Sequence, residues 1–378
     1  MKIYIIQISD ILCCPPILNL VNILEKFQIE TEVIGTKSDF FRVNSFKFIS
    51  FFELANLYDA SRSKFKKLTD MHSLKKQIWE EIEKTYTEND LIWITSDTAL
   101  KHLGNKVLKY NYVFQLMELS EEIRYYKKLP FKMDVVSIGN AALAIVVPEF
   151  NRAHIIKAWW RLKERPLILA NKPYITYNYE KNNVIDNEYA NDIIKKLSDK
   201  KIILYQGIIH KERPLDQYIY AVDKLGDEYA FVIMSNGENI YKDIKSSNYY
   251  FIPYVKAPNH LQITSHAYMG VLSYFPVPSD YSILNALFCA PNKTYEYAMF
   301  GIPMLGNDVP GLKYAFDTTG CGICIENFDT DSICSAIKQI ESKYDEMSRN
   351  SEIYYSETDS EQQLFYILET VKRRMKRE

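Results

Sequence analysis

The chain has 378 residues, of which 47% are hydrophobic and 25% are charged, and its 46 basic and 48 acidic residues give a net charge of −2. This is the composition of an ordinary folded protein long enough for two domains, and it excludes a disordered or collagenous chain. The near-zero net charge produces no strong positive field, so nucleic acid is not an expected partner.

The first half of the chain alternates short apolar runs with helical patterns. Pro15 and Pro16 favour a helix start at the first of these patterns, and Ser96–Asp97 is typical of a helix cap. Near-continuous apolar strands separated by helices are typical of a parallel sheet covered on both faces. The predicted strands are residues 2–8, 31–35, 46–52, 91–95, 112–116 and 144–147, and the predicted helices are 17–27 and 73–86.

A second series of the same kind begins after Lys172–Pro173. It ends in an amphipathic helix, residues 361–376, whose last turn is basic. The expected domains are therefore two Rossmann-like, doubly wound parallel-sheet domains, residues 1–172 and 173–358, followed by a terminal helix in 359–378. The strands predicted for the second domain are 201–206, 231–235, 250–252, 269–275, 303–306 and 322–325, and its helices include 191–197 and 215–225.

Six irregularly spaced cysteines do not form a disulfide framework, and the lone pair Cys321 and Cys324 is interpreted as core or turn residues rather than a redox or zinc site. We find no run long enough to span a bilayer and no signal peptide, so a cytoplasmic location is expected. The basic run 372–377 fits either a solvated helix end or peripheral contact with anionic lipid on the inner face of the membrane.

The segment 291–303 (PNKTYEYAMFGIP) carries the sharpest chemical pattern. Asn292 or Thr294 can cap a helix, on which Lys293 and Glu296 share one face because they are three residues apart. A lysine at a helix start suits a diphosphate, and a carboxylate one turn deeper can accept both hydroxyls of a ribose. The alternative is a surface salt bridge between the two side chains.

A second pattern lies in 206–214 (QGIIHKERP), which predicts a strand, a glycine turn and a helix with Pro214 in its first turn. Gly207 allows the backbone to approach a ligand closely, and the guanidinium of Arg213 can bind phosphate oxygens in a forked geometry. The alternative is a simple loop with a solvated cluster of charges.

Together with residues 303–312 (PMLGNDVPGL), these two segments resemble GT-B-fold glycosyltransferases of the large retaining family 4 type. The last segment matches the pattern G-x-P-hydrophobic-x-x-x-D-x-P-G that ends the donor site of that family. The resemblance is strong over about residues 200–325 and weaker before 165. It implies two Rossmann-like domains that face a central cleft, with the acceptor bound by the first, the nucleotide sugar bound by the second, and a C-terminal helix that crosses back to the first.

The resemblance also implies roles for individual residues. Arg213 and Lys293 would balance the charge of the diphosphate in place of a metal ion, so no metal and no other cofactor is expected. Glu296 would accept the ribose hydroxyls, and backbone near Tyr254 and Val255 would contact the base. The implied donor-binding residues are Gly207, Arg213, Tyr254, Val255, Asn292, Lys293 and Glu296.

Three positions depart from the family pattern. Ile208 stands where an arginine usually follows the loop glycine, and Phe288 stands in place of the first of two glutamates. In the first domain Met117 replaces a histidine, whereas the neighbouring Glu118 is retained. A methionine cannot transfer protons, so either Glu118 serves the acceptor or the leaving phosphate itself takes the proton, as a retaining reaction allows. The implied catalytic residues are Arg213, Lys293 and Glu118.

The pattern Asp329–Thr330–Asp331 resembles a metal-binding Asp-x-Asp, but its place before a helix favours a capping role. The predicted function is transfer of a sugar from a nucleotide-diphosphate donor to a glycan or lipid-linked acceptor, in surface polysaccharide biosynthesis and with retention. The alternatives are a catalytically inactive GT-B-like binding or scaffold subunit and a sugar-nucleotide 2-epimerase.

Overall fold

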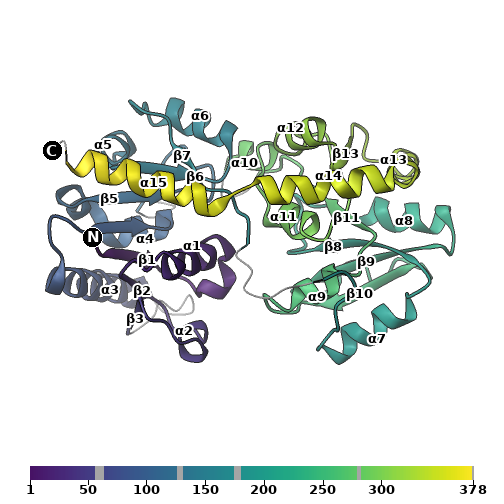
Figure 1. Ribbon diagram of the computed structural model, residues 1–378, viewed down its shortest axis with the longest axis horizontal. Coiled ribbons are helices and arrows are strands. Elements are labelled where there is room, and N and C mark those ends of the chain that lie inside the picture. Colours follow the sequence, from purple (N-terminus) through teal and green to yellow (C-terminus); the bar gives the residue numbers. More distant parts are fainter. Residues whose placement is uncertain (56–63, 126–130, 174–179, 279–281, 377–378) are drawn as a thin grey trace. The chain divides into compact units, whose positions relative to one another are not determined.

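Residues 1–55, 64–125, 131–173, 180–278 and 282–376 are described by the computed structural model (Figure 1). The chain divides into a first unit, Met1–Tyr174 with Asp359–Glu378, and a second unit, Ile175–Thr358. Each unit is built on its own parallel sheet, and each is described by itself.

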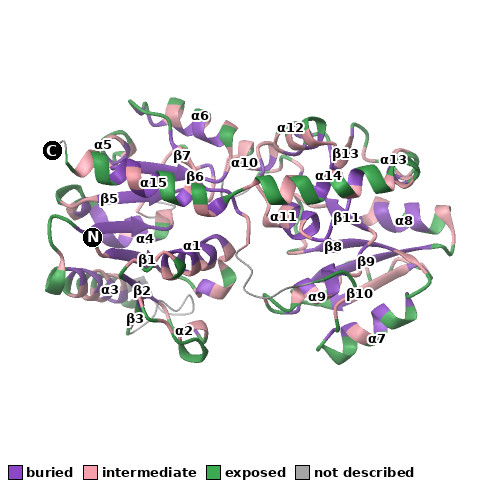
Figure 2. Ribbon diagram, viewed as in Figure 1, coloured by how far each residue is buried: buried purple, intermediate pink, exposed green. Residues whose placement is uncertain are grey.

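The sheet of the first unit has seven strands in the order β3-β2-β1-β4-β5-β6-β7. All its strand pairs are parallel, and β1 lies in register between β2 and β4. Its central strands are apolar along their whole length because helices cover both faces, and they are buried throughout (Figure 2). The strands are β1 Ile3–Gln7, β2 Thr31–Gly35, β3 Ile49–Glu53, β4 Leu91–Ile94, β5 Tyr112–Gln115, β6 Ala144–Val147 and β7 Leu167–Ile168.

The helices of the first unit include the last helix of the chain, α15 (Ser360–Met375). Its apolar side chains share one core with α1 and with the side chains on one face of β1 and β4, and the backbone NH of Ala170 donates to Gln363 Oε1 at 2.8 Å. The predicted return of the C-terminal helix to the first unit is therefore confirmed. The other helices are α1 Pro15–Lys26, α2 Phe40–Val43, α3 Lys64–Thr85, α4 Asp97–Leu103, α5 Val135–Ala141 and α6 Phe150–Trp159, with short 3₁₀ turns at Ile11–Cys13 and Gly104–Lys109.

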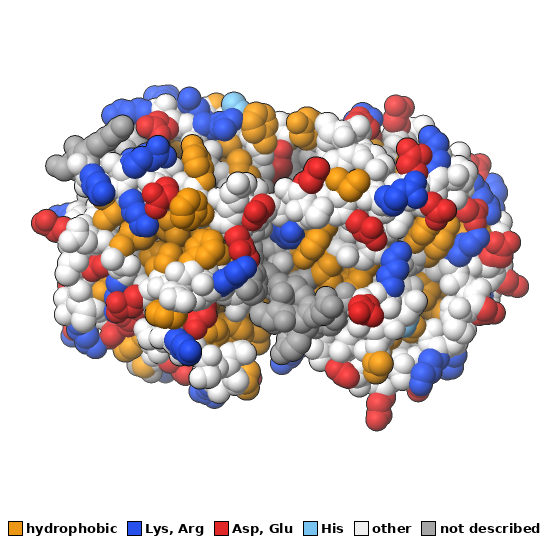
Figure 3. Space-filling view, viewed as in Figure 1, with side chains coloured by type: hydrophobic (Ala, Val, Ile, Leu, Met, Phe, Trp, Pro, Cys, Tyr) orange, Lys and Arg blue, Asp and Glu red, His pale blue; other side chains and the backbone are white. Residues whose placement is uncertain are grey.

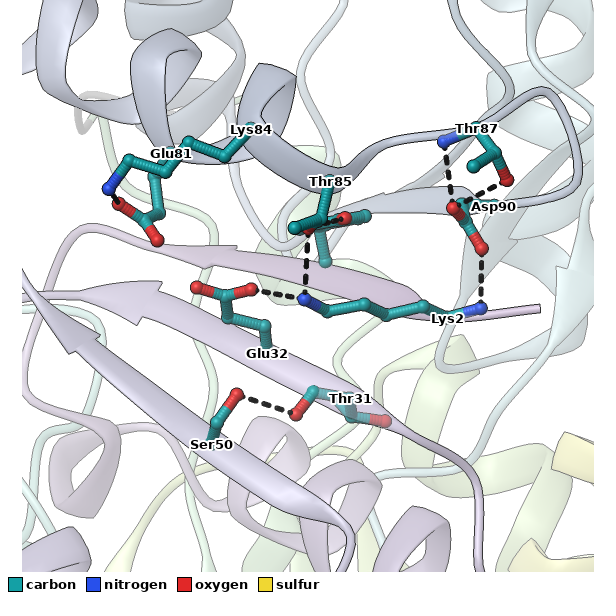
Figure 4. A network of polar contacts seen from close by, with 10 residues as sticks. Lys2, Thr31, Glu32, Ser50, Glu81, Lys84, Thr85, Thr87 and Asp90 are labelled. Atoms are coloured by element: carbon teal, nitrogen blue, oxygen red, sulfur yellow. Dashed lines mark hydrogen bonds and ion pairs between the residues drawn. The ribbon is translucent and has the colours of Figure 1, made fainter.

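A polar network closes the amino-terminal edge of the first sheet (Figure 4). The Lys2 ammonium donates to Glu32 Oε2 at 2.6 Å and to Thr85 Oγ1 at 3.3 Å, and its backbone NH donates to Asp90 Oδ1 at 2.7 Å. Thr87 donates to the other Asp90 oxygen through both its backbone NH and its hydroxyl. These bonds tie the start of β1 to β2 and to the loop between α3 and β4.

The sheet of the second unit has six parallel strands in the order β10-β9-β8-β11-β12-β13. Counted from its own first strand this is the order 3-2-1-4-5-6, the same arrangement as the first six strands of the first unit and that of a Rossmann fold. The strands are β8 Lys201–Gln206, β9 Tyr229–Ser235, β10 Tyr249–Pro253, β11 Met269–Leu272, β12 Met304–Asn307 and β13 Gly322–Ile325.

The helices of the second unit bury one face each against this sheet, in two separate apolar cores on its two sides. They are α7 Glu188–Lys196, α8 Asp216–Leu225, α9 His260–Thr264, α10 Leu284–Leu287, α11 Asn292–Ala298, α12 Pro310–Thr319, α13 Thr330–Ser342 and α14 Tyr344–Glu357. None of the helices in the described ranges combines the length and apolar composition that crossing a bilayer requires. On the face drawn in Figure 3, basic and acidic side chains are interspersed.

Most predicted elements are present, with ends shifted by a few residues. The largest difference is the helix predicted at 73–86, which begins at Lys64 and ends at Thr85. Ser96 caps α4 by accepting from the backbone NH of Ala99, and the prolines at 15 and 16 begin α1, as predicted. The strand predicted at 269–275 ends at Leu272, and the helix predicted at 215–225 begins at Asp216, so Pro214 lies before its cap rather than in its first turn. The two-residue strand β7 and the helix α6 were not predicted.

Candidate functional site

The order of the second sheet reverses between β8 and β11, because the chain leaves β8 toward β9 on one side and returns to β11 on the other. In open parallel sheets ligands bind beyond the carboxyl ends of the strands at this point, where two loops diverge. Gln206 ends β8, and Tyr274 follows β11. A ligand site in the second unit is therefore expected around these two positions.

The short helix α11 (Asn292–Ala298) is anchored beneath these strand ends. Tyr297 is fully buried, and its hydroxyl donates to the backbone oxygen of Leu204 in β8 at 2.9 Å. This contact holds Lys293 and Glu296 under the strand ends, where they are 8% and 6% exposed. The predicted cap is wrong: Pro291 is the cap residue, it makes no side-chain cap hydrogen bond, and Asn292 is the first helical residue.

Lys293 is a buried cation whose Nζ has no hydrogen-bond partner among the described residues. It lies 4.3 Å from the ring centroid of Tyr205 and 5.3 Å from that of Tyr274. A Cβ built on Gly207, which has φ +128°, would lie 3.4 Å from this nitrogen, so the glycine turn closes directly over it. Burial lowers the pKa of Lys293 well below its usual value, and the nearby Arg213 lowers it further.

Arg213 is the second cation at the same place. Its guanidinium lies 5.2 Å from the ring centroid of Tyr274, and its Nε is buried without a partner among the described residues. The backbone NH of Phe275 donates to the oxygen of Glu212 at 2.7 Å, so the loop that carries Arg213 is tied to the end of β11. Lys293 Nζ and Arg213 Nε, both near the ring of Tyr274, are thus buried without hydrogen-bond partners among the described residues.

The backbone of Tyr274 is itself held by Asn307, at the end of β12. The Asn307 side chain accepts from the backbone NH of Tyr274 at 2.7 Å and donates to its oxygen at 2.6 Å. Gly311, in the motif segment that follows, faces the backbone of Cys289, where a Cβ would come within 2.6 Å. The glycine of this motif therefore allows the chain that leads into α11 to pack closely.

Glu296 is an ordered, buried carboxylate beside these cations. Its Oε2 accepts from Gln206 Nε2 at 2.5 Å, and its Oε1 lies 3.2 Å from His260 Nε2. Thr264 in turn donates to Gln206 Oε1 at 2.6 Å. Burial alone would raise the pKa of Glu296, but the His260 imidazole and the Gln206 amide outweigh it, so the pKa is lowered and the carboxylate stays ionised.

The structure thus brings Gly207, Arg213, Lys293 and Glu296 together at one strand edge. Two other predicted residues of the second unit, Tyr254 and Val255, come directly after β10. Tyr254 has 46% of its surface exposed, whereas the side chain of Val255 packs into the core of the second unit.

Glu118 belongs to the first unit and follows β5. Arg152, on α6, is 4% exposed and donates to the backbone oxygen of Met117 at 2.6 Å. The same guanidinium lies 4.0 Å from Glu118 Oε2, and the Glu118 side chain is 43% exposed. A buried arginine therefore holds the loop on which this partly exposed carboxylate sits.

The Asp-x-Asp pattern is a helix cap, as predicted. Asp329 accepts from the backbone NH of Ser332 at 2.8 Å, and Asp331 pairs with Lys224. Cys321 is buried and Cys324 half-buried, and both are free thiols. Within the described ranges, no three His, Cys, Asp or Glu residues are grouped so that they could hold a metal ion.

Sequence reasoning missed the residues that support the site, which are Tyr205, Gln206, His260, Thr264, Tyr274 and Asn307. Gln206 had one usable signal, because a polar side chain at the carboxyl end of a buried strand is unusual. His260 and Thr264 had none, because they lie in a short helix far from the motifs in the chain.

No protein-family model and no curated protein sequence matches the chain. Solved structures match along its whole length. HepE of Anabaena, solved with UDP and glucose, has a TM-score of 0.67 at 11% identity, covering 98% of this chain and 99% of its own. Sucrose-phosphate synthase from Thermosynechococcus elongatus has a TM-score of 0.63 at 11% identity, covering 100% and 98%. WaaG, a glycosyltransferase involved in lipopolysaccharide biosynthesis, has a TM-score of 0.59 at 11% identity, covering 95% of this chain and 96% of its own.

At this identity the likeness shows the fold, and the fold is GT-B. Two Rossmann-like units with parallel sheets of seven and six strands, and a C-terminal helix that packs on the first unit, are the parts of that architecture. The predicted fold class is confirmed. Membership of family 4 stays a prediction.

Proposed function

We propose that the protein is a glycosyltransferase that binds a nucleotide-diphosphate sugar at the carboxyl edge of the second sheet. The observation that carries this proposal is the buried Lys293 ammonium, which has no hydrogen-bond partner among the described residues and faces the Gly207 turn. A buried ammonium that makes no hydrogen bond destabilises a protein unless a ligand supplies the missing acceptor oxygens. A diphosphate has the charge and the oxygen atoms to serve both Lys293 and Arg213.

In the proposed complex, each group of the donor has a partner. The diphosphate lies against Gly207, Lys293 and Arg213, and the ribose hydroxyls bond to Glu296. The start of α11 at Asn292 lies beside the diphosphate, and the backbone at 254–255 meets the base. The solved structures of HepE contain UDP or UDP-glucose, which supports a ligand of this chemical class.

The same cations assist the reaction. When the bond between the sugar and the diphosphate breaks, negative charge grows on the leaving phosphate oxygen, and Lys293 and Arg213 are placed to stabilise it without a metal ion. For a retaining transfer, the leaving oxygen accepts the proton of the attacking hydroxyl. Glu118, on the first unit, is proposed to orient the acceptor, a glycan or a lipid-linked sugar.

The test begins with a thermal-shift panel of UDP-glucose, GDP-mannose and ADP-glucose, because a ligand that binds only the folded state raises the melting temperature. We expect one of these donors to raise it, and we expect the double variant Arg213→Met, Lys293→Met to lose the shift while staying folded. Failure of every donor to shift the wild type, or an unchanged shift in the double variant, contradicts the proposal.

Turnover then separates an enzyme from an inactive scaffold. Ile208, Phe288 and Met117 depart from the family pattern, and these departures favour the alternative of an inactive scaffold subunit. Release of nucleoside diphosphate from the donor that binds, with and without candidate glycan acceptors, is expected for a transferase. Tight donor binding with no release under either condition identifies a binding subunit.

A further inference from the structure

We propose that Gln206 and His260 are positioning residues that hold the Glu296 carboxylate ready to accept both hydroxyls of a ribose, and that Thr264 orients the Gln206 amide. This inference rests on the proposed function, because it assigns the neighbours that make Glu296 selective for a ribonucleotide. It concerns three residues that no motif in the chain singles out.

The orientation of the Gln206 amide follows from its two neighbours. An ionised carboxylate can only accept hydrogen bonds, so the Gln206 atom 2.5 Å from Glu296 Oε2 is the amide nitrogen. The amide oxygen then faces the Thr264 hydroxyl at 2.6 Å, which can donate to it. Each group in this chain of bonds has the donor or acceptor that its neighbour needs.

His260 holds the other carboxylate oxygen. Its Nε2 lies 3.2 Å from Glu296 Oε1, so by the same argument Nε2 carries the proton. His260 Nδ1 is buried and has no partner among the described residues. The imidazole is therefore fixed by Glu296 alone, and it restrains the carboxylate in return.

Both supports come from one short helix. His260 and Thr264 are four residues apart in α9 and lie on the same face of it. Leu261 and Ile263, on the two flanks of this face, are 2% and 1% exposed and pack into the core of the second unit. A buried helix thus presents both groups to the carboxylate without relying on a loop.

The remaining capacity of Glu296 fits a vicinal diol. A carboxylate has about four lone-pair positions, two on each oxygen. Gln206 and His260 use one on each oxygen, which leaves one on each for a ligand. Two adjacent hydroxyls can bind such a carboxylate in a bidentate manner, and the ribose of a nucleotide carries this arrangement at its 2′ and 3′ positions.

The inference is tested by comparing ligands that differ only in the ribose. The dissociation constants of UDP, GDP and ADP, of their 2′-deoxy forms and of inorganic pyrophosphate are measured by calorimetry on the full chain. For the base that binds best, the wild type is expected to prefer the ribonucleotide by about tenfold, the value of one hydrogen bond to a charged group. In Gln206→Met and His260→Phe we expect this preference to fall to about twofold or less, with the affinity for pyrophosphate unchanged within about twofold.

Thr264 provides a test that leaves every proposed ligand contact in place. Thr264→Val is expected to reduce the preference for the ribonucleotide. Thr264→Ser keeps the hydroxyl and is expected to retain the wild-type preference. Thr318→Val is the matched control. Thr318 lies in a helix of the second unit, as Thr264 does, and its hydroxyl donates to the backbone oxygen of Tyr314 at 2.7 Å, but it is exposed. It should leave every constant unchanged.

The outcomes distinguish the two proposals. If the wild type binds pyrophosphate and nucleotides but does not discriminate against the 2′-deoxy forms, or if Gln206→Met and Thr264→Val keep the full preference, the positioning role is wrong and the diphosphate site stands. If the wild type binds neither pyrophosphate nor any nucleotide, the proposed function itself fails and the inference fails with it.

Discussion

The two sheets have the same strand order, yet the points where that order reverses carry different chemistry. In the first unit, between β1 and β4, the Thr95 hydroxyl donates to the backbone oxygen of Ile6 at 2.7 Å, and the Gln7 amide donates to Ser9 Oγ at 2.7 Å. In the second unit, between β8 and β11, Gln206 donates to a buried carboxylate beside the unpaired Lys293. The fold supplies the location in both units, and the side chains at the second one are those that we propose bind a diphosphate.

A second contrast concerns two lysines. The Lys2 side chain is 17% exposed and is paired with Glu32. Burial is the largest single influence and lowers its pKa, but the hydrogen bond to Glu32 and the neighbouring negative charges together outweigh it, so the pKa is raised. Lys293 is buried without such a partner, and its pKa is lowered. A paired lysine at the amino edge stabilises the fold, whereas a buried lysine without a hydrogen-bond partner at the carboxyl edge destabilises it, a cost that the proposed ligand would offset.

The largest effect on nucleotide binding is expected at Lys293, and it tests the contrast with Lys2. Lys293→Met should weaken binding of the preferred nucleoside diphosphate by about 100-fold, the upper range for a charged hydrogen bond. Without ligand, the same variant should be more stable by about 1–4 kcal/mol, the range seen when buried charges are replaced by apolar side chains of similar volume. Calorimetry and urea unfolding measure the two quantities. A variant that loses both affinity and stability would place Lys293 among structural residues like Lys2.

The pH dependence of binding is expected to follow from the same lysine. Burial and Arg213 lower the pKa of Lys293 from 10.5, so in the empty site Lys293 loses its proton below pH 10.5. A bound diphosphate favours the ammonium, so Lys293 takes up the proton again on binding. Nucleotide affinity should fall as pH rises through the window between the lowered pKa and 10.5, by at most about tenfold per pH unit. Calorimetry in two buffers of different ionisation enthalpy detects the uptake.

The stability of the ligand-free protein should move in the opposite direction. Within that window the unfolded chain binds more protons at Lys293 than the folded chain does, so stability rises with pH. Lys293→Met is the control for both measurements, because it should show no proton uptake and no such rise relative to wild type. Proton uptake that persists in the variant would assign it to another group.

Gly207 tests whether the turn over Lys293 belongs to the site. Gly207→Ala should destabilise the protein by about 1 kcal/mol, because its φ of +128° disfavours any side chain. It should also weaken nucleotide binding severalfold, since the new Cβ would lie 3.4 Å from Lys293 Nζ. Gly226→Ala is the matched control: its φ is +97° and nothing lies within 4 Å of the added atom, so it should lower stability alone.

The smallest expected effect on binding is at Lys2. Lys2→Met should lower the free energy of unfolding by about 1 kcal/mol, the net value of a charged hydrogen bond that solvent partly reaches, and leave nucleotide affinity unchanged. Lys84, which pairs with Glu81 on an exposed surface nearby, provides the comparison (Figure 4). Lys84→Met should leave the unfolding midpoint unchanged. A loss of nucleotide affinity in Lys2→Met would contradict the assignment of stability to the amino edge of the first sheet and of binding to the carboxyl edge of the second.

The sequence predicted most of the fold because the relevant signals are local. Apolar runs such as 201–206 identify buried strands, and the caps at Ser96 and Asp329 follow from one polar side chain ahead of a helical pattern. The errors also have local causes. Strand β7 has two residues, too few for a pattern, and the cap of α11 is Pro291, which offers no polar side chain to signal a helix start.

The site was predicted only in part, for a physical reason. Lys293 and Glu296 are recognisable together because three residues on a helix set their distance, and Gly207 is recognisable from its place after a strand. The partners of Glu296 are different: Gln206 is 90 residues away in the chain, and its own partner Thr264 is 58 residues from it. No periodicity relates residues at such separations.

The amino-acid sequence by itself therefore determined which segments are buried strands and helices, and that two parallel sheets follow one another, because burial periodicity is a property of neighbouring residues. The tertiary structure decided which polar groups meet. Whether a lysine is paired, as Lys2 is, or buried without a hydrogen-bond partner, as Lys293 is, depends on the packing of distant segments around it, and that packing exists only once the chain has folded.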